Sequence, residues 1–276
     1  MSALTMLHVP VSLDALARYA DYRSWSKRRC TNGHEADASF DQGRALHHVL
    51  DEAFGPGRLR PFRLMVPRGK SSGSIYAYTT ASKEELLDAF KTAAPPEATS
   101  ILTIASLDTK DMPDTWVKGR RLGFDVRVRP IMRVKGDLPI PRQPGKFYQQ
   151  GHELDAFFVE AQRTCPEGRP RNTPDGEHVP SGMIEAGRTR EAVYRDWLSA
   201  RLTDAAELDP EQTTMTSFER TVVARDGVRT EGPDTTFQGE LTIKDPAAFG
   251  SLLAGGVGRH KAYGYGMLLL RQLKRR

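Results

Sequence analysis

Apolar residues along the first hundred positions switch between two spacings. Short apolar runs and a period of two residues indicate strands, and stripes with a period of about 3.6 residues indicate helices. In chain order, these patterns predict a strand over 4–11, a short helix over 12–19, a polar irregular segment over 26–38, a helix over 41–54, strands over 62–66 and 74–79, a helix over 82–91 and a strand over 100–105. This βαββαβ order, with an extra helical insertion after the first strand, predicts a ferredoxin-like domain, the frame shared by RNA-recognition modules.

The same order of elements returns in the second half, after a polar segment at 108–114 that we interpret as the domain boundary. The later patterns predict a strand over 119–130, a helix over 188–202, a hairpin with arms at 216–225 and 235–244, a helix from Asp245 to the Gly255-Gly256 pair, and a strand over 267–270. The predicted fold class is therefore α+β, with two tandem ferredoxin-like (RRM-like) βαββαβ domains at 1–113 and 114–276. A loop-rich segment at 135–187, with one helical piece at 152–163, is predicted to be an insertion whose basic residues could contact RNA or a partner subunit.

The helix predicted over 41–54 has a regular amphipathic stripe. Its apolar members are Leu46, Val49, Leu50, Ala53 and Phe54. Ser39 or Asp41 is expected to cap its beginning, and glycine and proline end it. Arg44 and His47 are three residues apart on one flank of the stripe, so we expect them to be neighbours on the helix surface.

The strand predicted over 119–130 alternates between apolar and polar residues, so its two faces differ. The apolar face is formed by Leu122, Phe124, Val126 and Val128, and the polar face by Arg121, Asp125, Arg127 and Arg129. We expect the polar face to point outward and to be basic. Arg127 and Arg129 would then contact the phosphates of an RNA.

Composition sets broad bounds on the function. The chain has 276 residues, 38% of them hydrophobic and 27% charged, and a formal net charge of +5, which permits nucleic-acid binding without proving it. No apolar run reaches the roughly 18 residues of a membrane helix, and the first residues do not resemble a signal peptide. Cys30 and Cys165 lack the spacing of a metal site, so we expect a reduced, cytoplasmic protein, with a disulfide left open.

Four glycines fall within eleven residues between the last predicted helix and the last predicted strand. They are Gly256, Gly258, Gly264 and Gly266, and the residues between them include Arg259, His260 and Lys261. Because a helix precedes this segment and a strand follows it, the order is the reverse of a nucleotide-binding βαβ unit. The segment, called the glycine loop below (256–266), is interpreted as a cradle of backbone amides for phosphates, with added positive charge. A tight turn with solvated cations is the other reading.

The glycine loop also resembles a known signature. The pattern G-[VI]-G-x-x-x-A-x-G-x-G is matched by Gly256, Val257, Gly258, Ala262, Gly264 and Gly266. It is similar to the signature of the CRISPR repeat-RNA endoribonucleases, and the best match is the CasE family, the crRNA-processing subunit of Cascade. The resemblance is strong over 236–270 and moderate at 41–54 and 117–130.

The resemblance implies an activity and its partners. A CasE-like protein would cut CRISPR repeat hairpins in precursor crRNA without a metal or other cofactor, and would stay bound to the product beside other subunits of a Cascade-type complex. Metal-free cleavage uses the ribose 2′-hydroxyl as the nucleophile, so the protein must orient the phosphate and move a proton. A non-catalytic RNA-binding subunit of such a complex is the alternative. The sequence also lacks the spacing typical of a metal site.

The family has its catalytic histidine in a helical pattern like D-x-Y-x-x-H-x-x-L. In this chain the corresponding run GRALHHVL places His47 at the catalytic position and Leu50 at the apolar one. The family's tyrosine is replaced by Arg44, which could supply charge to the transition state. Otherwise the register is shifted by one residue and His48 is the catalytic histidine. The resemblance places RNA binding on all four glycines of the glycine loop and on Arg259, His260 and Lys261.

Overall fold

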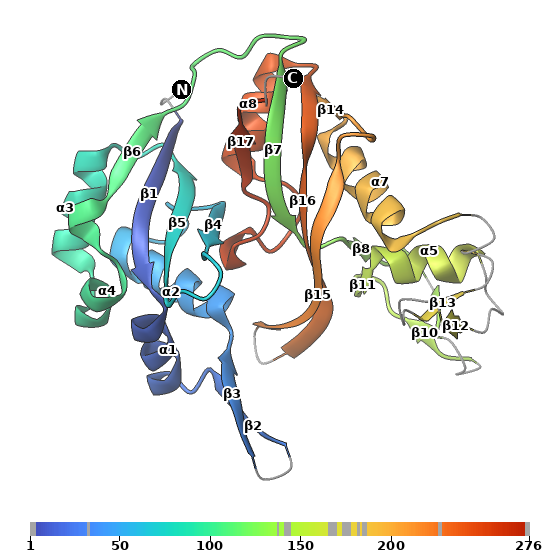
Figure 1. The fold of residues 1–276 in the computed structure, drawn as a ribbon, viewed down its shortest axis with the longest axis horizontal. Helices are drawn as coiled ribbons and strands as arrows, with labels where there is room; N and C mark the ends of the chain where they lie inside the picture. The colour runs from blue at the N-terminus through green and yellow to red at the C-terminus, as the bar shows by residue number, and fades with distance from the viewer. Residues whose placement is uncertain are drawn as a thin grey trace.

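The computed structural model describes residues 4–31, 34–136, 138–140, 145–164, 170–172, 178–180, 183, 187–225 and 228–273. It has two α+β halves, each built on an antiparallel sheet (Figure 1). This is the predicted fold class of two tandem ferredoxin-like domains.

The N-terminal sheet has the strand order β4-β5-β1-β6. Its strands are β1 (Thr5–Ser12), β4 (Phe62–Met65), β5 (Ser72–Thr79) and β6 (Asp108–Asp111), and its helices are α1 (Leu13–Tyr22), α2 (Gln42–Phe54), α3 (Lys83–Ala93) and α4 (Pro96–Ile101). Every neighbouring pair of strands is antiparallel. The last strand of the domain therefore lies beside the first, as in a ferredoxin-like sheet. The core between sheet and helices includes Leu7, Leu46 and Ile75.

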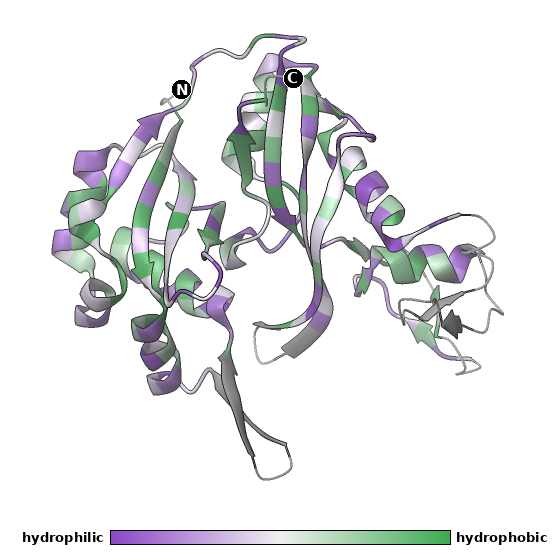
Figure 2. Cartoon of the chain, viewed as in Figure 1, coloured by the Kyte–Doolittle hydropathy of each residue, from purple (hydrophilic) through white to green (hydrophobic). Residues whose placement is uncertain are grey.

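The C-terminal sheet repeats this arrangement. Its strands are β7 (Arg121–Val128), β14 (Ala206–Leu208), β15 (Thr214–Arg225), β16 (Val228–Ile243) and β17 (Leu268–Arg271), with helices α7 (Arg190–Leu202) and α8 (Pro246–Gly255). The order is β14-β16-β7-β17, and β15 pairs with the other part of β16. Together β14 and β15 fill the position that one edge strand fills in the first domain. Figure 2 shows apolar and polar residues alternating along β7 and β16.

Short elements occupy the segment between β7 and α7. They are β8 (Ile131–Arg133), β9 (Leu138–Pro139), β10 (Phe147–Tyr148), β11 (Glu153–Asp155), α5 (Ala156–Thr164), β12 (Pro170–Asn172) and β13 (His178–Pro180). Strands β8 and β11 pair, and α5 packs against α7. This insertion extends outward beside α7 in Figure 1. The boundary predicted at 113/114 falls in the connection between β6 and β7.

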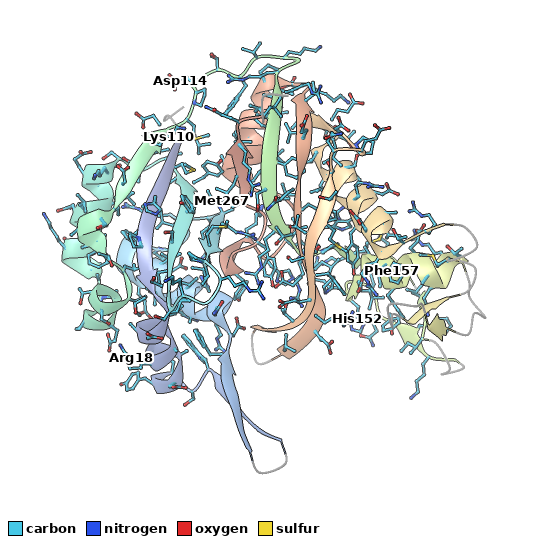
Figure 3. All side chains as sticks on the ribbon, viewed as in Figure 1. Arg18, Lys110, Asp114, His152, Phe157 and Met267 are labelled. Atoms are coloured by element: carbon cyan, nitrogen blue, oxygen red, sulfur yellow. The ribbon has the colours of Figure 1, made fainter. Side chains whose placement is uncertain are left out.

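The two halves share a buried interface. The Tyr78 hydroxyl in β5 donates a 2.9 Å hydrogen bond to the Leu268 carbonyl in β17. Met267, labelled between the two halves in Figure 3, is 1% exposed and belongs to the same apolar cluster as Tyr78 and Phe249. Because that cluster joins residues of both sheets, the relative position of the domains is set by apolar packing.

Three predicted elements differ from the structure. The segment at 26–38 is mostly a hairpin of β2 (Ser26–Thr31) and β3 (His34–Phe40) rather than irregular chain. The run at 100–105 is not a strand, because Ile101 ends α4 and a 3-10 helix, η1 (Ile104–Ser106), follows it. The strand that completes the first sheet is β6, inside the segment interpreted as a linker. The β15–β16 hairpin is also longer than its predicted arms.

Candidate active site

Helix α2 and the glycine loop meet, although they lie at opposite ends of the chain. Asp41 caps α2, since its Oδ1 accepts a 2.9 Å hydrogen bond from the Arg44 amide. Gly43 lies in the first turn, and a Cβ there would be only 2.7 Å from the Tyr263 carbonyl oxygen. One turn further along, the His47 ring lies 5.4 Å from the Tyr263 ring in an edge-on arrangement of 65°. The two motifs that carry the resemblance thus form one site.

His47 has both a donor and an acceptor beside the same ring nitrogen. Its Nδ1 is 3.2 Å from Nη2 of Arg60 and 3.4 Å from Oδ2 of Asp51, and Arg60 and Asp51 pair with each other. A guanidinium only donates, so neutral His47 accepts from Arg60 at Nδ1, whereas protonated His47 donates from Nδ1 to Asp51. Both protonation states therefore have a partner. Since the side chain is 21% exposed, the histidine is neither fully buried nor fully solvated.

Arg44 and His48 lie together against a different residue, Trp25. The guanidinium carbon of Arg44 is 4.6 Å from the centre of the Trp25 ring. The His48 ring stacks on Trp25 at 4.5 Å and 29°. Burial lowers the pKa of His48 below its ordinary value. The spacing placed Arg44 beside His47, but the structure places its guanidinium over Trp25.

Tyr263 is a candidate site residue that the sequence patterns do not indicate. It ends the short 3-10 helix η2 (Lys261–Tyr263) within the glycine loop. It occupies a variable position of the loop signature, and its contact with His47 joins residues far apart in sequence. Because the resemblance concerns each motif by itself, it does not indicate that Tyr263 and His47 are in contact. The family pattern has a tyrosine on the same helix as the histidine. In this structure the tyrosine near His47 comes instead from the glycine loop.

The loop glycines are packed against the protein itself. Gly258 has φ +72°, and a Cβ there would lie 2.8 Å from Cη2 of Trp197. Gly266 has φ +81°, and its Cβ would lie 2.3 Å from the Val257 carbonyl oxygen. The Val257 amide donates to the Gly266 carbonyl at 2.8 Å, which closes the loop. Glycine is needed here for the fold of the loop, because L residues with a Cβ rarely adopt this φ and the space is filled. Phosphate binding by the loop stays a prediction.

Arg259 and His260 of the glycine loop contact the insertion. Arg259 Nε is 2.7 Å from Oε1 of Glu153 in β11, and His260 Nε2 is 3.0 Å from Oε2 of the same carboxylate. His260 is 7% exposed and has a left-handed backbone, with φ +60°. Lys261 makes no ion pair with any residue that the structure describes. Glu153 therefore links the insertion to the loop.

Beyond Arg121, the polar face predicted over 119–130 is largely covered by the protein. Arg129 is 2% exposed and donates to Oγ1 and to the carbonyl of Thr221 at 3.0 and 3.1 Å. Arg127 makes two hydrogen bonds to the buried Asp234, one of them 2.8 Å long from Nε to Oδ1. The expected solvent exposure is wrong for Asp125 and Arg129, each only 2% exposed because other protein groups cover them, but it holds for Arg121, whose side chain is 51% exposed. As folded, Arg129 presents almost no surface to a phosphate.

Electrostatics explain how this face tolerates burial. Burial by itself would raise the pKa of Asp234. The hydrogen bonds and the positive charge of Arg127 outweigh this effect, together with a 2.8 Å hydrogen bond from the Tyr265 hydroxyl, so the pKa is lowered. Arg63, from the N-terminal sheet, lies 3.4 Å from Asp125 of β7. Burial lowers the pKa of Arg63 to about 10. The face is a paired polar network that spans the two domains.

Among the residues that the structure describes, no three His, Cys, Asp or Glu side chains are placed to hold a metal ion. Within the same residues, no helix is long and apolar enough to cross a membrane. Cys165 lies outside the described residues.

A model of the protein family described as CRISPR associated protein matches residues 16–272. No curated protein matches the chain. Cas6e from Escherichia coli str. K-12 has a TM-score of 0.53 and 19% identity, covering 98% of this chain and 100% of that one. Thermus thermophilus Cse3 bound to an RNA representing a pre-cleavage complex has a TM-score of 0.52 and 18% identity, covering 98% and 99%. At such identities the likeness establishes the shared fold.

Proposed function

Because the chain belongs to the family of CRISPR-associated proteins, we propose that it is an endoribonuclease that cuts CRISPR repeat hairpins in precursor crRNA without a metal ion. The observation that carries the proposal is the environment of His47, with Arg60 and Asp51 at Nδ1 and Tyr263 of the glycine loop beside the ring. The RNA-bound, pre-cleavage state of the similarly folded Thermus thermophilus Cse3 supports an RNA substrate.

The proposed reaction needs only a positioned phosphate and proton transfer. The ribose 2′-oxygen attacks phosphorus as its proton leaves, and the bond to the 5′-oxygen breaks as that oxygen takes up a proton. The products are a 2′,3′-cyclic phosphate and a 5′-hydroxyl. With Nδ1 of His47 turned to Arg60 and Asp51, its Nε2 exchanges the proton with the RNA. A positioned acid or base accelerates such a step by roughly 10²–10⁴.

Other groups of the site would stabilise the phosphate. The Lys261 ammonium supplies positive charge to the developing dianionic phosphorane, and the Tyr263 hydroxyl supplies a hydrogen-bond donor. Arg259 contributes only by exchanging its ion pair with Glu153 for a phosphate. The protein would stay bound to its product within a Cascade-type complex, as the resemblance implies.

The test is cleavage of the cognate repeat RNA in EDTA by the purified protein, resolved on a denaturing gel. We expect one cut per hairpin, loss of cutting in His47→Ala with retained binding, and a much smaller loss of cutting in His48→Asn. Loss in His48→Asn with a fully active His47→Ala would shift the register by one residue. Tight binding without any cut by the wild type would favour the non-catalytic RNA-binding subunit.

A further inference from the structure

Helix α1 contacts both α2 and β2 in the N-terminal half, whose ribbon is drawn in Figure 1. An aromatic and cationic cluster lies where these elements meet. Its centre is Trp25. The His48 ring stacks on Trp25 at 4.5 Å, the Arg44 guanidinium lies 4.6 Å from the ring centre, and that of Arg23 lies at 5.7 Å. We call Trp25, Arg44 and His48 the stacking platform. All three are partly exposed, so the platform forms part of the molecular surface.

The stacking platform is fixed by its surroundings. The Trp25 amide donates to the Ala20 carbonyl at 2.8 Å, which ties it to the end of α1. Tyr19 meets the Trp25 ring edge-on at 5.8 Å, and its hydroxyl donates to Glu52 of α2 at 3.0 Å. Arg23 also pairs with Glu52, at 2.9 Å, so that carboxylate is neutralised rather than facing a ligand. A preordered surface of this kind loses little entropy when a ligand stacks on it.

The platform adjoins the proposed catalytic histidine. The rings of His47 and His48 are 5.1 Å apart, tilted by 41°. A planar group stacked on the platform would therefore lie next to a phosphodiester held at His47. Aromatic rings and arginine planes are the groups on which proteins stack unpaired RNA bases. An in-line attack by a 2′-hydroxyl also requires the flanking nucleotide to leave helical geometry, which unstacks its base.

We propose that the stacking platform binds the base of an unpaired nucleotide flanking the cleaved phosphodiester. This inference rests on the proposed function. It gives Arg44 a stacking role at the base rather than a role at the transition state. The platform tolerates any base, because every base offers a π face and the three side chains present no fixed pattern of donors and acceptors to a base edge.

The experiment combines variants of the protein with variants of the RNA. Repeat hairpins with an abasic site on either side of the cleaved phosphate are cut under single-turnover conditions in EDTA by wild type, Trp25→Ala and Trp25→Phe. We expect one of the two abasic sites to slow wild-type cleavage about tenfold or more, the magnitude typical of a lost base stack. The same abasic site should cause no further loss in Trp25→Ala, and Trp25→Phe should behave much like wild type.

Two outcomes would overturn the platform. If the rate losses caused by the abasic site and by Trp25→Ala multiply, the two changes act independently. If Trp25→Ala cuts intact RNA at the normal rate, no base that matters for cleavage is bound at Trp25. A melting curve establishes that each variant is folded. If the wild type binds the hairpin without cutting it, the proposed activity fails separately. The platform is then judged by 2-aminopurine at the flanking positions, whose fluorescence should be quenched by wild type and not by Trp25→Ala.

Discussion

Replacing Gly258 by alanine tests why the glycine loop needs its glycines. Gly258 has φ +72°, and the new methyl group would meet Trp197 at 2.8 Å, inside the apolar cluster that also contains Tyr78 and Met267. Gly69, in the β4–β5 connection, is a matched control. It has nearly the same φ, +73°, but no atom within 4 Å of the position of a Cβ. The pair separates backbone strain from lost packing space.

The expected magnitudes follow from these two terms. A left-handed backbone costs an L residue roughly 1–2 kcal/mol, and this applies to both substitutions. Forcing a methyl group against a packed core side chain adds about 1–3 kcal/mol, and only in Gly258→Ala. We therefore expect the free energy of unfolding to fall by about 1–2 kcal/mol in Gly69→Ala and about 2–5 kcal/mol in Gly258→Ala.

Denaturant unfolding followed by tryptophan fluorescence measures both variants, and hairpin affinity is measured in parallel on the folded protein. Gly69→Ala should bind and cut RNA normally. Equal destabilisation of the two variants would refute the packing argument. If Gly258→Ala kept its stability and lost RNA affinity, the glycine would serve the approach of a phosphate rather than the packing of the loop.

Three further predictions concern charge. Arg127→Ala should cost about 3–5 kcal/mol of stability because it removes the guanidinium that pairs with the buried Asp234 carboxylate, while the salt dependence of RNA binding stays unchanged; a log–log slope lowered by about 0.7–0.9 would instead reveal a phosphate contact. Glu153→Gln should tighten RNA binding, because it releases Arg259 from its ion pair for a phosphate; weaker binding with slower single-turnover cleavage would show instead that the carboxylate positions Arg259. Burial lowers the pKa of His48, so the folded state favours the neutral ring and stability should decline as the pH falls below about 6.5; His48→Gln should weaken this decline in thermal melts from pH 7 to 5, and an unchanged profile would contradict it.

The repeated fold could be predicted because its strands and helices have local signatures. Helix α2 shows this well, with a cap at Asp41 and an apolar stripe that is buried as expected. Two misassignments have local causes. The apolar run around Ile101 is buried but helical, since short apolar runs do not distinguish strand from helix. The β2–β3 hairpin is mostly polar, so it lacks the apolar run that indicates the other strands.

The candidate site was only half predictable from the sequence. The sequence indicates His47 and the glycine loop as candidates, because each belongs to a motif of its own. Their contact through Tyr263 joins distant parts of the chain, so neither motif indicates it. The same limitation explains Arg129. The alternation over 119–130 predicts an outward side chain for Arg129, but only the tertiary structure determines that it is covered.

The central claim is most directly tested by removing the nucleophile from the RNA. A repeat hairpin with a single 2′-deoxyribose immediately 5′ of the cleaved phosphate is compared with the all-ribose hairpin in EDTA. We predict that wild type binds both equally, cuts only the all-ribose RNA and leaves a 2′,3′-cyclic phosphate, and that His47→Ala binds both but cuts the all-ribose RNA roughly 10²–10⁴ times more slowly. Cleavage of the deoxy-substituted hairpin, or cutting that EDTA abolishes in the wild type, would contradict metal-independent attack by the 2′-hydroxyl.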